Sequence, residues 1–450
     1  MKYLKIMCFA LMASLTCTVT TSCSSDDDDN SQVTTLPTIQ ELDNQHAKIV
    51  VGTKTSSPDG TYTLSSGDQV TVVSGVVVSI KTADEIAKEE EETKRNQALT
   101  AVNQNFVHST VVATYKGLAD VTEDMIAAIE AIAEGGDDEV AAACELWKDA
   151  RQYWEWSESH LFGAASGYSI DPHIDTWPFD RTQFEAYMKK YNPATNEKDA
   201  AIIDEAIATG QNLTGFHAVE YLLFREGQPR KRKDINADEL YFMESAANDL
   251  YLNSCILEAA WAGLDNVSSA RQALLAEAER EPADNFGWEM DNAGQAGSRW
   301  KTILQGSVQI IEGCSDITDE VGNAKIASAY KEEDTSYIES PHAYNSITDF
   351  YDNIIGVKNA LYGLSPSIEN YNVTTPATNS VIGYALTNDA LKAPAQDVMN
   401  KLETALAAIN KMVRPFVKNY KDPSCGVAID ALEDLDEALG VLADAYLTLE

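Results

Sequence analysis

Residues 429–449 read IDALEDLDEALGVLADAYLTL, and no other part of the chain indicates its fold class as clearly. The apolar residues of this segment recur at spacings of three and four, with acidic residues between them. That spacing is typical of a helix with one buried face. An earlier segment repeats the pattern with Val398, Leu402, Leu406, Ile409, Val413 and Phe416. Because helical spacing continues through the chain beyond residue 82, we predict an all-α fold for this part.

Long predicted helices with mostly short connections are typical of antiparallel bundles. Counting them predicts two four-helix-bundle domains, the first over 83–230 and the second over 231–450. Ser340-Pro341 resembles an N-cap followed by proline at the first helical position, so we expect a helix from there to about Leu361. Each domain would bury its own core between four helices.

Within a small N-terminal segment over 37–82, residues 47–80 have the alternation of strands rather than the spacing of helices. Their alternating apolar residues are Ile49, Val51, Tyr62, Leu64, Val70, Val72, Val76, Val78 and Ile80. Turn signals such as Ser74-Gly75 separate the predicted strands. We therefore predict a small N-terminal β-meander, which at this size needs packing against something larger.

The first residues of the chain have the features of a secretory signal. Lys2 and Lys5 precede an apolar run that is too short to remain as a membrane span. Cys23 lies at the expected cleavage point, so we predict a signal peptide over 1–22 and a lipoprotein with its lipid on Cys23. Residues 23–36 then form a lipidated acidic tether.

The run from Ser24 to Asp29 resembles the acidic export tag of surface-displayed lipoproteins in some Gram-negative bacteria. We therefore expect an exported, outer-membrane lipoprotein that is exposed at the cell surface. The alternative is a plain solvated tether on the periplasmic face.

The chain is strongly acidic, with 71 Asp and Glu residues against 33 Lys and Arg residues and a formal net charge of −38. This charge argues against nucleic acid or anionic lipid as a partner. We therefore expect membrane contact through the lipid anchor alone. The charge fits an exported protein that must stay soluble, or one that attracts cations.

Four cysteines lie in the predicted helical part, namely Cys144, Cys255, Cys314 and Cys425. No two of them have C-x-x-C spacing, which argues against a zinc site built from thiolates. Disulfide pairing and free buried thiols both stay open.

The segment GFHAVEYLLF over 215–224 places His217 and Glu220 on one face of a predicted helix. The H-E-x-x-H zinc motif is absent, and Tyr221 stands where the inverted H-x-x-E-H motif has its second histidine. The Glu-x-x-His pairs of di-iron bundles run in the opposite order. His217 and Glu220 would therefore supply two ligands of a single metal site, or a buried pair that joins two helices.

Three further segments gather polar and aromatic side chains. They are Trp154 to Gly163, His173 to Asp180, and Glu339 to Asp349 followed by Asn353. Each of them alone is consistent with a packed core or a helix cap. Together with the segment around His217, they suggest a shared polar site.

These segments, taken in order, resemble the imelysin-like family, exported bacterial proteins once classed as metallopeptidases. The family hallmark G-x-H-x-x-E falls on Gly215, His217 and Glu220. The upstream matches are Trp147, Ala150, Arg151, Ser157, Glu158, Phe162, Gly163, Ile174, Asp175, Trp177 and Pro178. The downstream matches are Glu339, Ser340, Tyr344, Ser346, Asp349, Phe350, Asn353, Ile354, Leu361, Tyr362 and Gly363. The resemblance covers roughly residues 97–450.

The resemblance implies two four-helix bundles with the functional cleft between them, and a role in bacterial iron or haem acquisition. From the first bundle it implies the cleft residues His217, Glu220, Glu158, Asp175 and Trp177. From the second bundle it implies Ser346, Asp349 and Asn353.

We therefore expect a surface lipoprotein that binds iron, or an iron-bearing ligand such as haem or a chelate, at the cleft between the bundles. His217 and Glu220 would be ligands for iron or another divalent or trivalent metal, and iron-transport proteins would be the partners. Hard ferric iron prefers oxygen donors, so a carboxylate-rich cleft with one imidazole suits it. Two alternatives stay open: a metal-dependent peptidase, and a non-catalytic module that docks another envelope protein through its acidic faces. The small number of motif ligands favours binding over catalysis.

Overall fold

The computed structural model describes residues 35–175, 177–190, 200–209, 213–368 and 373–449. The predicted signal peptide over 1–22, the predicted lipid on Cys23 and most of the predicted tether over 23–36 lie outside the described residues. The chain divides into two compact units, and the boundary after Glu90 falls within α2 (Ala83–Asn105). Within the described ranges, no helix is long and apolar enough to cross a membrane.

The N-terminal unit contains a three-stranded antiparallel sheet in the order β1-β2-β3, which confirms the predicted β-meander. Its elements are α1 (Ile39–Asn44), β1 (Gly60–Thr63), β2 (Gln69–Val73) and β3 (Val76–Lys81). The core of this unit consists of Ile39, Val70, Val72 and Val77. Since Ile39 belongs to α1, this core joins the helix to the sheet.

A β-bulge corrects details of the strand prediction. The pairing of β2 with β3 shifts between Thr71 and Val72, so that Val72 lies opposite Val77. An extra residue on one strand changes which side chains share a face. Val77 is therefore buried, whereas Val78, one of the predicted alternating residues, is 48% exposed. The strand predicted around Val51 is wrong, because that residue lies in a turn and is 62% exposed.

The second unit is helical. Its long helices are α3 (Val112–Ala131), α4 (Asp137–Ser157), α10 (Ala237–Ala262), α13 (Ile303–Asp319), α15 (Ser346–Tyr362), α17 (Lys392–Asn410) and α19 (Pro423–Leu447). Its shorter helices are α5 (Ala164–Gly167), α6 (Asp171–Ile174), α7 (Arg181–Met188), α8 (Ala200–Thr209), α9 (Gly215–Leu223), α11 (Ser269–Glu277), α12 (Phe286–Asp291), α14 (Ala327–Tyr330), α16 (Val381–Ala385) and α18 (Phe416–Asn419). Two π-helices are η1 (Phe106–Val111) and η6 (Glu320–Ile326), and a two-stranded ribbon consists of β4 (Phe224–Arg225) and β5 (Gln228–Pro229).

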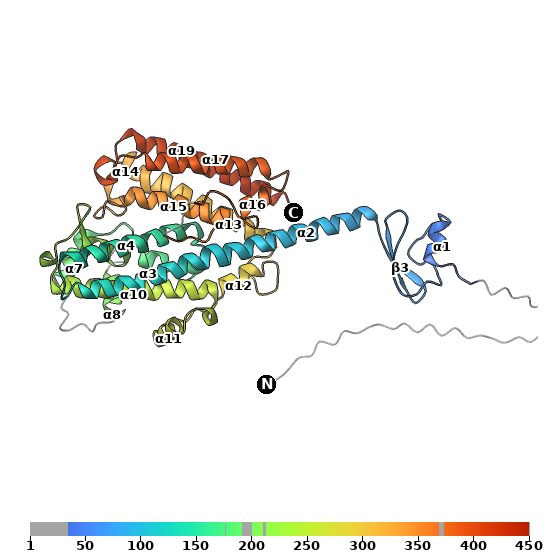
Figure 1. Cartoon of the computed structure of the whole chain (residues 1–450), viewed down its shortest axis with the longest axis horizontal. Helices are drawn as coiled ribbons and strands as arrows, with labels where there is room; N and C mark the ends of the chain where they lie inside the picture. The colour runs from blue at the N-terminus through green and yellow to red at the C-terminus, as the bar shows by residue number, and fades with distance from the viewer. Residues whose placement is uncertain (1–34, 176, 191–199, 210–212, 369–372, 450) are drawn as a thin grey trace, which may run out of the picture. The chain divides into compact units, whose positions relative to one another are not determined.

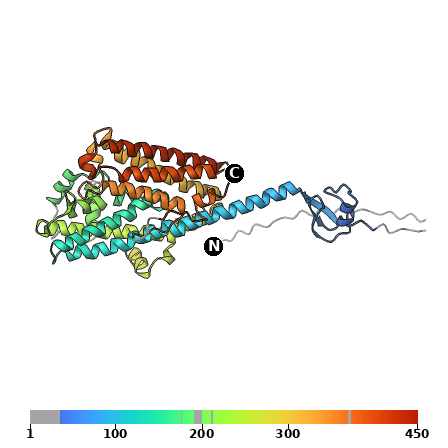
Figure 2. The ribbon, with the colours of Figure 1, turned by 45° about the horizontal axis from the view of Figure 1, so that its top comes forward.

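The long helices form two packed groups, which confirms the predicted all-α bundle architecture (Figure 1). α3 packs against both α4 and α10, while α13, α15, α17 and α19 pack on one another. The two groups stay distinct when the molecule is turned (Figure 2). α15 packs on α4 and thereby joins them.

The predicted boundary between the bundles at residue 230 stays a prediction. α10 follows that residue in the sequence, yet it packs along α3 and against α9. The residues from Glu91 onward also form one compact unit. The bundle that contains the H-x-x-E motif therefore draws on helices from both sides of residue 230.

The C-terminal helices follow the predicted periodicity until a proline interrupts it. The apolar face of α19 is buried from Ile429 to Tyr446, as predicted. α17, however, ends at Asn410, and Phe416 begins the separate helix α18. Pro415 explains this correction, because proline lacks a backbone N–H and disfavours helical conformation in the residue before it.

The helix predicted to open at Ser340 begins later, at Ser346. Ser340 has a φ angle of +44° and Tyr344 one of +59°. These angles lie outside the right-handed helical region, so the backbone turns between the two residues instead of coiling. The turn points the backbone N–H groups of His342 and Ala343 towards α9.

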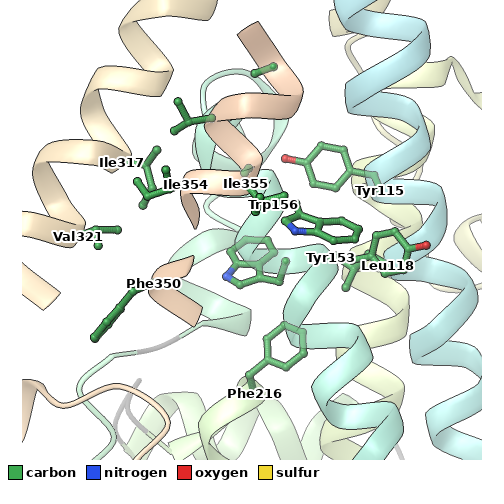
Figure 3. Close-up of a cluster of buried hydrophobic side chains, with 14 of the residues drawn as sticks. Tyr115, Leu118, Tyr153, Trp156, Phe216, Ile317, Val321, Phe350, Ile354 and Ile355 are labelled. Atoms are coloured by element: carbon green, nitrogen blue, oxygen red, sulfur yellow. The ribbon is translucent and has the colours of Figure 1, made fainter. Parts of the chain in front are cut away.

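Apolar side chains fill the contact between the two helix groups (Figure 3). The labelled residues come from α3 (Tyr115, Leu118), α4 (Tyr153, Trp156), α9 (Phe216), α13 (Ile317), η6 (Val321) and α15 (Phe350, Ile354, Ile355). Gly356 allows α15 to approach closely, because an added Cβ would lie 2.6 Å from the carbonyl oxygen of Trp156. Burial of this apolar surface stabilises the relative position of α4 and α15.

Gly215, the first residue of α9, has a φ angle of +71°. An added Cβ would lie 2.1 Å from the carbonyl oxygen of Ile174. Both observations require glycine at this position. The contact sets α9 directly against the end of α6.

Replacing Gly215 by alanine should lower the free energy of unfolding by about 3 kcal/mol, because backbone strain and the clash with Ile174 both oppose the native conformation. Urea unfolding followed by circular dichroism measures the change. Gly440→Ala is the matched control, since Gly440 lies within α19 and an added Cβ meets nothing within 4 Å. That substitution should stabilise the protein by about 0.5–1 kcal/mol. Equal effects of the two substitutions would contradict the assignment of strain to Gly215.

Candidate functional site

Several segments of the helical unit bring charged side chains to one buried place. The first is the end of α4 with the turn η2 (Glu158–His160), and the second is the residue that follows α6. The other three are the helix α9, the π-helix η6 and the turn before α15. We name the group they form the charged cluster, and its members are Arg151, Glu155, Glu158, Asp175, His217, Glu220, Lys325 and Glu339. None of them is more than 9% exposed. Charges buried this deeply must be paired or hydrogen-bonded.

Arg151 connects three of these segments. Its guanidinium pairs with Asp175 and Glu155 and contacts Oε1 of Glu339 at 2.9 Å. Burial alone would lower the pKa of Arg151, but the three carboxylates outweigh it and hold the pKa well above its usual value. The end of α4, the residue after α6 and the turn before α15 therefore share one cation.

His217 lies between two carboxylates. Its Nε2 atom is 3.2 Å from Oδ1 of Asp175, and its Nδ1 atom is 3.6 Å from Oε2 of Glu220. Burial alone would lower the pKa of His217, but its contacts with the carboxylates of Asp175 and Glu220 raise it to about 9. Burial would raise the pKa of Asp175, but Arg151 and His217 hold it below its usual value. Trp154 also donates its indole N–H to Oδ2 of Asp175 at 2.7 Å.

Glu220 ties α9 to the turn before α15. Its Oε1 atom accepts the backbone N–H groups of His342 and Ala343, each at 2.7 Å. One carboxylate oxygen is thus used for structure, while the other lies beside His217. The spacing of the two motif residues gives each a different set of contacts.

Lys325 and Asn353 both contact Glu155, near the end of α4, and Glu158, in η2. The Nζ atom of Lys325 is 2.8 Å from Glu158, 3.3 Å from Glu339 and 3.7 Å from Glu155. Asn353 donates its side-chain N–H groups to Glu155 at 2.6 Å and to Glu158 at 2.7 Å. Burial raises the pKa of Glu155 and of Glu158 well above the usual value, although Arg151 and Lys325 respectively oppose the shift.

The structure brings five of the predicted site residues together: His217, Glu220, Asp175, Glu158 and Asn353. The other three make contacts of their own. Ser346 donates its hydroxyl to the backbone carbonyl of Glu339 at 2.5 Å, and Asp349 accepts an N–H of Asn345 at 2.7 Å. Trp177 is half-buried and packs edge-on against Tyr337, with ring centroids 5.0 Å apart. The functional role of all eight residues stays a prediction.

Four members of the charged cluster are absent from the predicted site: Arg151, Glu155, Lys325 and Glu339. Three of them lie in segments that the sequence already singles out, but nothing local distinguishes a ligand from a counterion there. One feature of the sequence could have singled out Lys325. It is the one charged residue between Val321 and Tyr330, in a stretch of otherwise small, polar and apolar residues. A lysine with such neighbours is expected to be buried only when it is paired.

Two overlapping groups within the charged cluster have the spacing of a metal site. One atom each from Asp175, His217 and Glu339 lie within 4.8 Å of one another, and so do oxygens of Glu155, Glu158, Asp175 and Glu339. Among the described residues, Oε2 of Glu339 has no hydrogen-bond partner although it is buried. Carboxylates with one imidazole are a donor set suited to hard and borderline cations.

Sequence comparison supports the resemblance. The Imelysin family model matches residues 111–442. Iron-regulated protein A of Synechococcus elongatus is 24% identical over 261 residues, which cover 58% of this chain and 63% of that protein. The chain thus spans less than two thirds of the length of this curated relative.

Two crystal structures have a similar fold. A proposed iron-regulated protein A precursor from Parabacteroides distasonis has a TM-score of 0.65 at 23% identity, over 78% of this chain and 95% of that one. An imelysin-like protein from Psychrobacter arcticum has a TM-score of 0.51 at 13% identity, over 78% and 93%. These identities are low, so the likeness concerns the fold alone. Because the family model covers more than half of its residues, the chain belongs to the imelysin family, as its motifs predict.

Proposed function

We propose that this protein binds one iron ion in the charged cluster and serves iron acquisition at the cell envelope. The observation that carries the proposal is the buried group of Asp175, His217 and Glu339, whose ligand atoms lie within 4.8 Å of one another. Membership of the imelysin family and the iron-regulated relative support an iron-related role.

The chemistry of these groups favours a cation, and iron in particular. The charged cluster contains five carboxyl groups against the three cationic side chains Arg151, Lys325 and His217, so its formal charge is negative when all of these groups are ionised, although burial favours the protonated forms of Glu155 and Glu158. A metal ion would compensate that excess. Oxygen donors with one imidazole suit iron better than softer metals that prefer thiolates.

Glu220 would orient His217 rather than bind the ion itself. Its Oε1 atom already accepts two backbone N–H groups, and its Oε2 atom lies 3.6 Å from Nδ1 of His217. A metal-binding histidine commonly donates its second ring N–H to a carboxylate, which fixes the ring and its tautomer. Nε2 of His217 is then the atom that would meet the ion, and the prediction that Glu220 is a direct ligand stays open to test.

The other hypotheses receive less support from the geometry. Ligand atoms this close suit one ion, whereas haem needs a flat pocket beside its axial ligand. A metallopeptidase needs an open coordination position for water, yet Asp175, His217 and Glu339 are each at least nine-tenths buried. An interaction module requires no metal at all, so metal titration separates it from the proposal.

We also propose that lipid on Cys23 anchors the protein in the outer membrane, with exposure at the cell surface, and that iron-transport proteins receive the ion. The basic and apolar character of residues 1–22 and the acidic run after Cys23 support this localisation.

Substituting ligands should reduce iron binding without unfolding the protein. His217→Gln and Glu339→Gln should each weaken anaerobic Fe(II) binding by at least about tenfold, because each removes one donor. Isothermal titration measures the affinity, and circular dichroism checks the fold.

Asp352→Asn is the matched control for these ligand substitutions. Asp352 is another buried carboxylate on α15, and it accepts N–H groups from Gln152 and Trp156 outside the ligand group. This variant should bind Fe(II) like the wild type. The proposal fails if all three variants and the wild type bind Fe(II) equally well, or if none binds it.

Iron binding should depend on pH through His217. The pKa of about 9 lies above the ordinary value of 6.5, so His217 holds a proton at neutral pH that it must release to coordinate iron. Affinity should therefore rise by about tenfold per pH unit as the pH approaches 9 from below and level off above about pH 9. Titration with Fe(II) in buffers of different ionisation enthalpy should detect about one released proton at pH 7. An affinity that is unchanged over this range would contradict coordination by His217.

Removing the predicted lipid site should change the location of the protein. Cys23→Ala in the full chain should prevent incorporation of radiolabelled palmitate and move the protein from the membrane fraction to the soluble fraction. Cys144→Ala, which removes a buried thiol of α4, is the matched control and should remain membrane-associated. Equal labelling of both variants would contradict lipidation at Cys23.

A further inference from the structure

A second group of carboxylates lies beside the proposed iron ligands. Oxygens of Glu155, Glu158, Asp175 and Glu339 lie within 4.8 Å of one another. Asp175 and Glu339 belong to this group and also to the group with His217. Shared carboxylates between two donor groups are the arrangement in which proteins bridge a pair of metal ions.

Lys325 already supplies a cation to this second group. Its Nζ atom lies 2.8 Å from Glu158, 3.3 Å from Glu339 and 3.7 Å from Glu155, and the residue is 2% exposed. A lysine ammonium is a compact positive charge with three N–H donors. Glu158 and Glu339 accept two of those donors and Glu155 adds its charge at 3.7 Å, so three carboxylates surround the ammonium in the way that ligands surround a metal ion.

The backbone around Lys325 is specialised for this placement. Lys325 lies in η6, a π-helix that continues α13 before α14 begins. π-helical turns are rare and occur frequently at functional sites, because the wider turn shifts side chains relative to an α-helix. The shifted turn delivers the ammonium to carboxylates from η2, α4 and the turn before α15.

We infer that Lys325 takes the place of a second metal ion, so that the charged cluster accepts one ion instead of two. The inference rests on the proposed iron function for the first ion. Lys325 is then the residue that determines the metal stoichiometry. Without it, Glu158 would lose its cationic partner while Glu155 and Glu339 would still pair with Arg151, and the three carboxylates would form a site for a divalent ion.

Lys358 provides a matched control, because it is another buried lysine on a helix of the same unit. It is 3% exposed, and its Nζ atom contacts a single carboxylate, Oε1 of Glu403, at 2.8 Å. The side chain of Glu403 is 58% exposed, so water can solvate it when the lysine is removed. Substitution of Lys358 therefore removes a buried ammonium without leaving a group of carboxylates.

The test measures how many Fe(II) ions each full-length protein retains after anaerobic gel filtration. Wild type, Lys358→Met and Lys325→Arg should retain one ion per chain, whereas Lys325→Met should retain two. One ion in both wild type and Lys325→Met would overturn the inference and leave the proposed function intact. No ion in the wild type but one in Lys325→Met would support the inference and overturn the proposed function. No ion in either protein would overturn both.

Folding of the Lys325→Met variant is itself informative. Added Fe(II) should raise its midpoint of thermal unfolding more than that of the wild type, because two ions rather than one would stabilise the folded state. If the variant is insoluble without metal, Fe(II) in the growth medium should restore soluble protein. A variant that stays insoluble with and without Fe(II) would count against the inference, since a second ion is expected to replace the lost charge.

Discussion

The contact between Arg151 and its three carboxylates is the interaction on which the rest of the site depends. Burying a guanidinium is costly, and only paired carboxylates with good geometry compensate for the lost hydration. The planar fork of arginine can reach several carboxylates at once, which the point charge of lysine cannot do with the same fixed geometry. Asp175 and Glu339 come from segments far apart in the sequence, so this one side chain determines where both must lie. A proposed ion would meet ligands that are already held in position.

The G-x-H-x-x-E motif places His217 beside Asp175, one of the carboxylates that Arg151 holds. Gly215 allows α9 to approach the end of α6, which places His217 beside Asp175. One helical turn later, Glu220 accepts two backbone N–H groups from the turn before α15. The motif thus connects both helix groups, while the Nε2 atom of His217 lies beside Asp175 in the charged cluster.

The sequence predicts those features that depend on local spacing. The buried face of α19 and the small sheet follow from periodicity and turn signals, whereas the grouping of His217 with Asp175 and Glu158 is what the family resemblance implies. The turn after Ser340 is held by Glu220, which lies 120 residues earlier. Local sequence patterns therefore could not show that the helix begins at Ser346 rather than at Ser340. The β-bulge beside Val72 and the role of Lys325 likewise depend on partners that only the folded chain brings together. Pro415 is different, because its effect on α17 is local and its presence is visible in the sequence.

The electrostatic state of the charged cluster links its stability to its proposed function. Burial raises the pKa of Glu155 and Glu158, so these carboxylates hold protons more readily than exposed ones do. His217 also holds a proton at neutral pH, because Asp175 and Glu220 stabilise its charged form. A metal ion and the proton of His217 therefore compete for the same nitrogen atom. Since the ligand atoms are almost fully buried, exchange of the ion requires local opening of the segments that cover them. The tie between Glu220 and the turn before α15 is one hydrogen-bonded contact that such an opening would break. An acidic environment favours protonation over metal binding, so the same groups that hold the ion also provide a physical route for its release.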